Sequence, residues 1–124
     1  MMDLISKEKT FEIIGICMKI HAILGMGLKE VNYKDAMEID FNERKIAFER
    51  EKKFTVKYKG KDLRNPYKAD FVVFDSLILE IKSVSCILDC HLAQALSYLA
   101  VSGLRLALVI NFGERSLVVK RVVL

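Results

Sequence analysis

Charged side chains interrupt two apolar segments near the centre of the sequence. Asp70 lies in the first segment, which ends at Phe74, and Glu80 and Lys82 lie in the second, which begins at Leu77. Side chains alternate between the two faces of a strand, so Glu80 and Lys82 point the same way, about 7 Å apart along it. Because burying an unpaired ion costs several kcal/mol, these charges require compensating partners.

The turn between the two segments decides whether the two carboxylates meet. A three-residue loop centred on Asp75 places Asp70 directly opposite Glu80. A two-residue loop at Asp75-Ser76 shifts the pairing by one residue and leaves the carboxylates offset. The sequence alone permits both registers.

The charges can be compensated in two ways. Lys82 can form an ion pair with Asp70 or Glu80. Alternatively, both carboxylates can hold a divalent cation, with Lys82 directed at the group that the metal activates. The charges by themselves favour neither alternative.

Apolar periodicity and glycine turns predict two amphipathic helices before the central segments. The first follows Ser6 as its N-cap and ends at Gly25, with Phe11, Ile14, Cys17, Met18 and His21 at helical spacing. The second runs from about Leu28 to Arg44, with Val31, Ala36, Met37 and Ile39 on its inner side.

The remaining pattern predicts a mixed sheet. Strands are expected from Ile46 to Lys59, on both sides of the central turn, from Leu104 to Asn111 and from Leu117 to Val123. A third helix is expected from about Leu88 to Ser102, closed by Gly103, with Leu88, Leu92, Ala95, Leu96 and Leu99 as its core side. The strand–helix–strand order implies a parallel, right-handed crossover. The expected fold class is therefore α/β, with a central mixed β-sheet flanked by helices (an α+β mixed sheet).

Two of the predicted helices carry polar residues that could reach the acidic pair. Glu30, in the first turn of the second helix, is either a favourable charge near the helix N-terminus or a third carboxylate for a metal. On the third helix, His91, Gln94 and Tyr98 are spaced three and four residues apart and point roughly one way. They form either an ordinary polar edge or part of a site beside Asp70.

Composition indicates one globular domain over residues 1–124, with 52% hydrophobic and 29% charged residues. No apolar run approaches the roughly 20 residues of a membrane span, and the N-terminus lacks a signal-peptide pattern. We therefore expect a cytoplasmic protein that binds no membrane. The odd number of cysteines, Cys17, Cys86 and Cys90, predicts free thiols.

Basic residues are concentrated between Arg44 and Lys68. This segment is either a solvated ribbon with charged outer positions or a surface that binds a polyanion. Under the second interpretation, we expect Lys52, Lys53 and Lys57 to contact nucleic acid.

The central motif resembles that of the PD-(D/E)xK nuclease superfamily. Ala69-Asp70 and Glu80-Ile81-Lys82 follow its pattern, without the proline that precedes the aspartate there. In addition, Gln94-x-x-x-Tyr98 resembles the Q-x-x-x-Y element of RecB-like nucleases.

A narrower resemblance is to the GxxExxY family, which looks like a compact branch of this superfamily. Its signature matches the segment from Gly27 through Glu30 to Tyr33. The resemblance runs nearly end to end, and the further matches are His21, Tyr67 to Phe71, Glu80 to Lys82, His91 to Gln94 and Ile110 to Gly113.

The resemblance implies a restriction-endonuclease-like core and a nuclease that depends on Mg²⁺ or Mn²⁺, with DNA as the expected substrate. Asp70, Glu80 and the backbone carbonyl of Ile81 would ligate the metal. Glu30 would hold a water on that metal or a second ion. Lys82 would orient the attacking water or stabilise the phosphate oxygens.

The same resemblance implies that Gln94 positions the site and that Tyr98 touches the nucleic-acid backbone, with His91 as a weaker candidate. Two other interpretations remain open. One is a non-catalytic module that binds nucleic acid or protein and retains the fold; the other is a nuclease subunit that needs a partner. The chain has room for little beyond the core, which favours a homodimer or a partner subunit.

Overall fold

The computed structural model describes residues 7–124, so the predicted N-cap Ser6 lies outside the described residues. Over this range the chain forms three helices and seven strands. The helices are α1 (Lys7–Leu24), α2 (Glu30–Glu43) and α3 (Asp89–Ser102). The strands are β1 (Phe48–Phe54), β2 (Lys57–Tyr58), β3 (Lys61–Asp62), β4 (Tyr67–Val73), β5 (Leu77–Lys82), β6 (Leu106–Asn111) and β7 (Val118–Val123).

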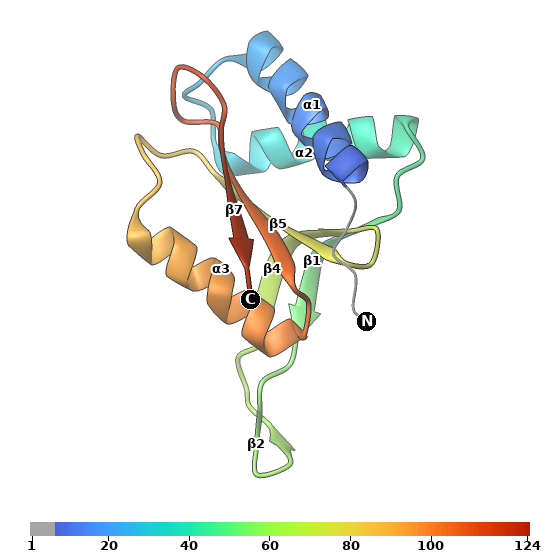
Figure 1. Cartoon of the computed structure of the whole chain (residues 1–124), viewed down its shortest axis with the longest axis vertical. Helices are drawn as coiled ribbons and strands as arrows, with labels where there is room; N and C mark the ends of the chain where they lie inside the picture. Colours follow the sequence, from blue (N-terminus) through green and yellow to red (C-terminus); the bar gives the residue numbers. More distant parts are fainter. Residues whose placement is uncertain (1–6) are drawn as a thin grey trace.

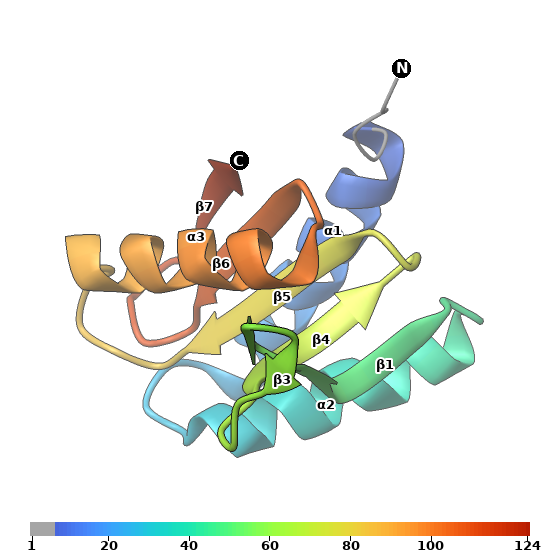
Figure 2. The same ribbon diagram turned by 90° about the horizontal axis from the view of Figure 1, so that it is seen from below.

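Five strands form one mixed sheet in the order β1-β4-β5-β6-β7. Strands β5 and β6 are parallel, and the other neighbours are antiparallel. Helices α1 and α2 cover one face of the sheet and α3 covers the other (Figures 1 and 2). This arrangement confirms the predicted α/β fold class, and the parallel pairing of β5 with β6 across α3 confirms that the crossover is parallel.

The predicted strand region from residue 46 to residue 59 divides into two pieces. After β1, the strands β2 and β3 form a separate two-stranded hairpin, which projects from the body of the molecule (Figure 1). Gly60 provides its turn with a positive φ of 77°, a conformation that glycine adopts without steric cost.

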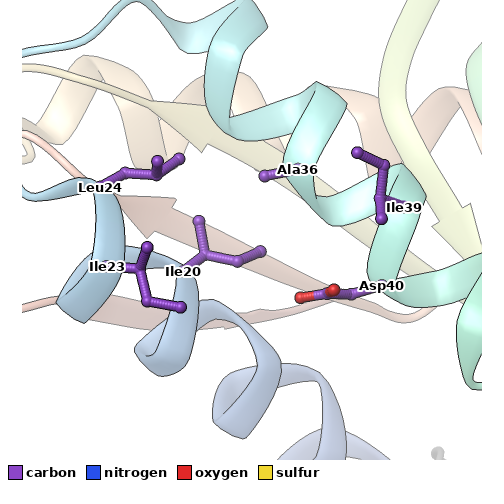
Figure 3. A pocket seen from close by; sticks show the side chains of 6 residues that line it. All are labelled: Ile20, Ile23, Leu24, Ala36, Ile39 and Asp40. Carbon is purple, nitrogen blue, oxygen red and sulfur yellow. The ribbon is translucent and has the colours of Figure 1, made fainter.

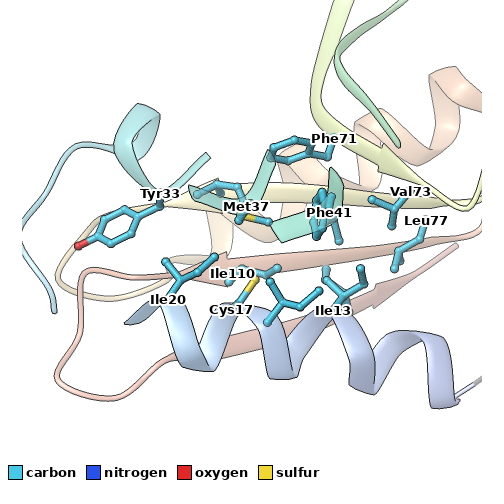
Figure 4. Packing of buried hydrophobic residues seen from close by; sticks show 14 of the residues in the cluster. Ile13, Cys17, Ile20, Tyr33, Met37, Phe41, Phe71, Val73, Leu77 and Ile110 are labelled. Atoms are coloured by element: carbon cyan, nitrogen blue, oxygen red, sulfur yellow. The ribbon is translucent and has the colours of Figure 1, made fainter. Parts of the chain in front are cut away.

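The larger hydrophobic core fills the space between the sheet and the helices α1 and α2 (Figure 4). Strands β5 and β6 supply nearly continuous apolar runs because both of their faces are covered. The smaller core, on the α3 side, includes Ala95 and Leu99 from the helix and Val72, Ile78 and Val109 from the sheet. Both cores hold the central strands β4, β5 and β6 in place.

The predicted inner side of α2 is confirmed for Met37 and, as a partly buried residue, for Ala36, but is wrong for Val31 and Ile39. The helix buries Tyr33, Met37 and Phe41 at four-residue spacing, whereas Val31 and Ile39 are exposed. The two aromatic rings fill more core volume than the aliphatic side chains would, and their burial rotates the helix away from the predicted orientation. This rotation also buries Lys34.

The predicted core sides of the other two helices differ less from the structure. In α1, Cys17 is buried as predicted, but Phe11 and Met18 are exposed, and the other buried apolar residues are Ile13, Ile16 and Ile20. In α3, Ala95 and Leu99 are buried as predicted, but Leu88 and Leu96 are exposed. Gly103 ends α3 with a φ of 78°, as predicted. The three cysteines are free, and Cys17 is buried.

An apolar hollow of about 170 Å³ lies between α1 and α2 (Figure 3). Its lining residues are Ile20, Ile23, Leu24, Ala36, Ile39 and Asp40. The residues predicted from the sequence as catalytic or metal-binding lie elsewhere, on β4, β5 and α3 and at the start of α2, and the lysines predicted to bind nucleic acid lie on β1 and β2. The hollow is therefore separate from the candidate site.

Candidate active site

The β4–β5 hairpin brings the two central carboxylates together. Its ladder pairs Phe71 with Leu79, Val72 with Ile78, and Val73 with Leu77. Three residues, from Phe74 to Ser76, form the loop, and both Phe74 and Asp75 have a positive φ. This is the predicted register with Asp75 at the centre of the turn, and it places Asp70 opposite Glu80.

Beyond the ladder, each carboxylate binds a backbone amide of the opposite strand. The amide of Asp70 donates a hydrogen bond to Glu80 Oε2 at 3.0 Å. The amide of Ile81 donates one to Asp70 Oδ2 at 2.7 Å. The two side chains therefore cross between the strands and satisfy amides at the position where the regular pairing ends.

The counter-ion of Asp70 is Lys34 on α2. Lys34 Nζ lies 2.9 Å from Asp70 Oδ1 and 2.8 Å from Glu51 Oε1. Burial acts to lower the pKa of Lys34, but the hydrogen bonds and charges of Glu51 and Asp70 outweigh it, so the pKa is raised above its ordinary value. The ammonium group is therefore positively charged at neutral pH.

The alternative in which Lys82 pairs with Asp70 or Glu80 is wrong. Within residues 7–124, Lys82 forms no ion pair with either carboxylate. Its Nζ instead donates a hydrogen bond to Gln94 Oε1 at 3.4 Å. The half-buried Lys82 ends β5 and extends toward α3, so its charge stays available at the edge of the site.

Sequence reasoning also missed Glu51. The β1–β4 pairing sets Arg50 against Phe71 and Lys52 against Ala69, which places Glu51 opposite Asp70. The carboxylates of Glu51, Asp70 and Glu80 thus lie at matching positions of three neighbouring strands, a set that we call the acidic row. No signal in the sequence indicated Glu51, because the burial of Lys34, which requires an acidic partner, is evident only from the observed orientation of α2.

Glu80 carries the largest electrostatic perturbation in this row. The residue is only 5% exposed, and this burial, followed by the negative charge of Asp70, raises its pKa to about 8. The hydrogen bond from the Asp70 amide and the charges of Lys82 and Lys34 oppose this rise. Burial thus disfavours the charged form of the Glu80 carboxyl group, and the nearby positive charges of Lys82 and Lys34 do not offset this cost.

A cleft of about 540 Å³ opens beside Asp70 on the side of α3. Its lining residues are Glu51, Pro66, Tyr67, Lys68, Asp70, Gln94, Ser97 and Tyr98. The Tyr98 hydroxyl donates to the Lys68 carbonyl at 3.0 Å, and its ring packs edge-on against Tyr67 at 4.9 Å. Burial, and then the charges of Glu80 and Asp70, raise the pKa of Tyr98 to about 12. The structure thus brings Gln94 and Tyr98 to the acidic row.

Within residues 7–124, no hydrogen bond or ion pair joins Glu30 to this cluster, although Glu30 lies one helical turn before Lys34 on α2. It is exposed at the start of α2, two residues after Leu28, whose carbonyl accepts a hydrogen bond from Ser83 Oγ at 2.7 Å. Residues 7–124 contain no group of three or more acidic, histidine or cysteine side chains arranged to hold a metal. The metal role of Glu30 stays a prediction, since no contact joins it to Asp70 or Glu80.

His91 has a structural contact instead. Its Nδ1 lies 2.9 Å from the backbone amide of Leu88 and accepts a hydrogen bond from it, at the start of α3. This contact satisfies a free amide next to the helix N-terminus.

A buried amide side chain fastens the segment that follows Lys82. Asn111 Nδ2 donates to the Val84 carbonyl at 2.9 Å and to Glu114 Oε2 at 2.9 Å. Asn111 Oδ1 accepts from the amides of Val84 and Gly113, each at 3.0 Å. A Cβ atom on Gly113 would overlap the Val84 backbone, so glycine is required at this close approach. We call these contacts the Asn111 latch.

The glycine turn before α2 is held next to this latch. The Tyr33 hydroxyl donates to the Gly25 carbonyl at 2.6 Å, and the Leu28 amide donates to that hydroxyl at 3.2 Å. The Tyr33 ring stacks on Phe112 with centroids 4.3 Å apart. His21 Nε2 lies 2.8 Å from the Glu114 carbonyl. Three residues that match the GxxExxY pattern, His21, Tyr33 and Phe112, thus make structural contacts near the end of β5.

The three lysines predicted to bind nucleic acid have different surroundings. Lys52 Nζ lies 2.8 Å from Glu49 Oε1, and Lys57 Nζ lies 2.6 Å from Asp62 Oδ1. Lys53 is exposed opposite Lys68 on β4, and no ion pair within residues 7–124 involves it. Of the three, Lys53 therefore offers the most available charge.

The donor set suits a magnesium-like cation. Asp70 and Glu80 provide hard oxygen atoms. After burial, the negative charge of Asp70 is the second cause of the raised pKa of Glu80, and a dication bound to both carboxylates would relieve this repulsion. Mg²⁺ retains several waters and needs only one or two carboxylates from a protein. Two carboxylates and the Ile81 carbonyl therefore fit Mg²⁺ or Mn²⁺ without a third acidic side chain.

Comparisons with known proteins agree with this fold and motif. The family model of the PD-(D/E)XK nuclease superfamily matches residues 7–122. The chain therefore belongs to the PD-(D/E)XK nuclease superfamily. No curated protein and no solved structure matches the chain. Across residues 7–124, none of the helices has both the length and the apolar character needed to span a membrane.

Proposed function

We propose that this protein is a metal-dependent nuclease that hydrolyses phosphodiester bonds of nucleic acid. The crossed carboxylates of Asp70 and Glu80 carry the proposal, since each is fixed by a backbone amide of the opposite strand. They lie beside a cleft that also contains Gln94 and Tyr98. Superfamily membership supports a nuclease-like activity.

Asp70, Glu80 and the Ile81 carbonyl would hold Mg²⁺ or Mn²⁺ in this function. When bound, such an ion lowers the pKa of a coordinated water and neutralises charge on the phosphate. Lys82 would orient the attacking water or stabilise the phosphate oxygens. Its hydrogen bond to Gln94 Oε1 sets the direction of the ammonium group. In this role Gln94 positions Lys82.

The cleft offers a path for the nucleic-acid backbone past the acidic row. Tyr98, together with Tyr67, presents aromatic surface there, and Lys68 brings positive charge. Lys52, Lys53 and Lys57 would extend the contact along β1 and β2 by attracting phosphates. We propose DNA as the substrate, and a homodimer or a partner subunit as the source of any additional binding surface.

We further propose that the chain is a member of the GxxExxY branch and acts in the cytoplasm. The contacts of Tyr33 with the Gly25 carbonyl and the Leu28 amide give a structural role to that signature. Glu30 would act on the site through a water on the metal, because within residues 7–124 no hydrogen bond or ion pair joins it to the acidic row.

A non-catalytic module with the same fold is the second candidate. The observation in its favour is the Lys34–Asp70 ion pair, which compensates one carboxylate without any metal. Such a module would bind nucleic acid or protein and cleave nothing.

One experiment separates the two candidates. Labelled single- and double-stranded DNA and RNA are incubated with purified protein in Mg²⁺, Mn²⁺ or chelator. We expect metal-dependent cleavage that Asp70→Asn and Glu80→Gln abolish. Glu49→Gln, which removes an exposed carboxylate of β1 paired with Lys52, should retain it. If no substrate is cleaved, or if both site variants remain active, the nuclease proposal is wrong.

A further inference from the structure

The acidic row contains a cation of its own. Lys34 is buried, and its ammonium group contacts both Asp70 and Glu51. The Glu51 side chain is 43% exposed and that of Asp70 is 19% exposed, so the ammonium group lies on the buried side of these two carboxylates. One oxygen of Asp70, Oδ1, is therefore already neutralised by the protein.

The two ends of the row differ in charge. At the β1 end, Lys34 compensates Glu51 and Asp70 together. At the β5 end, Glu80 has no ion pair within the described part of the chain, and its Oε2 accepts only the Asp70 amide among the hydrogen bonds of the structure. The direct ion pairs within the described residues are thus made by Glu51 and Asp70 and not by Glu80.

We propose that Lys34 is a fixed cation in place of a second divalent ion, so that the acidic row binds one ion, between Asp70 and Glu80. This inference rests on the proposed metal-dependent function. A second dication shared by Glu51 and Asp70 would lie next to the ammonium group, and repulsion between like charges a few ångströms apart in a partly buried site opposes its binding. Removing the ammonium leaves two carboxylates at that end, which is a sufficient protein contribution for such an ion.

Counting bound Mn²⁺ tests this inference without an activity measurement. Free Mn²⁺ is followed by electron paramagnetic resonance during titration of the metal-free protein. We expect one ion per chain in the wild type and two in Lys34→Met. The double variant Lys34→Met/Glu51→Gln should return to one ion, because the second ion would need the Glu51 carboxylate.

Arg50→Met is the matched control. Arg50 also joins β1 to α2, through Asp35 and Glu38, but it contacts no carboxylate of the acidic row. We expect this variant to bind one ion like the wild type. Lys34→Gln provides a second test if circular dichroism shows that Lys34→Met is unfolded, since the glutamine amide can still donate hydrogen bonds to both carboxylates.

The outcomes separate this inference from the proposed function. Two ions in the wild type, or one ion in the folded Lys34 variants, would overturn the role of Lys34. In that case the loss of binding in Asp70→Asn would still support the metal site. If Asp70→Asn binds Mn²⁺ as the wild type does, the metal site itself is wrong, and the role of Lys34 is wrong with it.

Discussion

The β4–β5 hairpin has two halves that are held together by different interactions. Near the turn, three residue pairs form a regular ladder of buried apolar side chains, from Phe71 with Leu79 to Val73 with Leu77. In the other half, beyond the last ladder pair, the carboxylates of Asp70 and Glu80 accept hydrogen bonds from backbone amides of the opposite strand. The apolar half fixes the register, and the acidic half depends on that register because a slip of one residue would separate the two carboxylates.

The comparison shows that the two halves of this strand pair contribute differently: the apolar half stabilises the fold, and the acidic half contains the candidate site. Burial of apolar surface near the turn stabilises the fold. The acidic half concentrates like charges at low exposure, which costs stability unless a proton, a lysine or a metal compensates them. Substitutions in the two halves should therefore have different and separable effects.

Substitution in the apolar half should give the largest effect. Leu79→Ala removes a fully buried side chain, and we expect the free energy of unfolding to fall by about 2–5 kcal/mol. Urea denaturation measures this loss. Mn²⁺ affinity of the folded variant should stay unchanged, and a large loss of affinity would show that the two halves are not separable.

Lys82→Met tests the proposed catalytic role of the lysine at the end of β5. It keeps the side-chain stem and deletes the charge, and we expect cleavage to slow by about 10²–10³-fold, the usual loss for one oriented electrostatic donor. Stability in saturating Mg²⁺ should change little, because Lys34 rather than Lys82 pairs with Asp70. A strong loss of stability together with unchanged cleavage would assign Lys82 a structural role.

Glu80 should make the stability of the metal-free protein depend on pH. Its pKa rises from 4.5 to about 8 on folding, so between these values the native state binds more protons than the unfolded state. The free energy of unfolding should then decrease with rising pH, by up to about 1.4 kcal/mol per pH unit. Denaturation of the wild type and of Glu80→Gln in chelator measures the difference, which should be confined to this window. Equal slopes in both proteins would contradict the raised pKa.

The smallest effect concerns the charged strand β1 beside the acidic half. Lys53→Glu should flatten the salt dependence of DNA binding, by about 0.9 in log K against log salt for each duplex phosphate released. Lys57→Glu is the control, since Lys57 is already paired with Asp62 and should change the slope less. Fluorescence anisotropy in a salt series measures both. Equal slopes in the wild type and Lys53→Glu would leave this strand as a solvated ribbon.

Much of the fold follows from the sequence because it depends on local signals. Apolar runs defined the central strands, and glycines defined the ends of helices, as at Gly103. The helix faces were harder to predict, because packing of Tyr33 and Phe41 against the sheet overrides the aliphatic periodicity of α2. Aromatic volume is a tertiary effect that a short pattern does not encode.

The candidate site was predicted in part. Proximity of Asp70 to Glu80 depended on one loop length, which the sequence left open and the structure decides. The contacts of Lys34 with Glu51 and Asp70 join three elements that are distant in the sequence. Such contacts arise from the placement of α2 on the sheet, so motif spacing alone does not reveal them.

The Asn111 latch has a consequence for the kinetics of substrate capture. The buried Asn111 side chain joins the Val84 backbone to the end of β6 by two hydrogen bonds, so we expect the backbone directly after Lys82 to keep its position. For the proposed nuclease, substrate binding would then require no rearrangement of the backbone at Val84. The association rate constant should accordingly fall with ionic strength, because added salt screens the attraction between the basic residues and the phosphates.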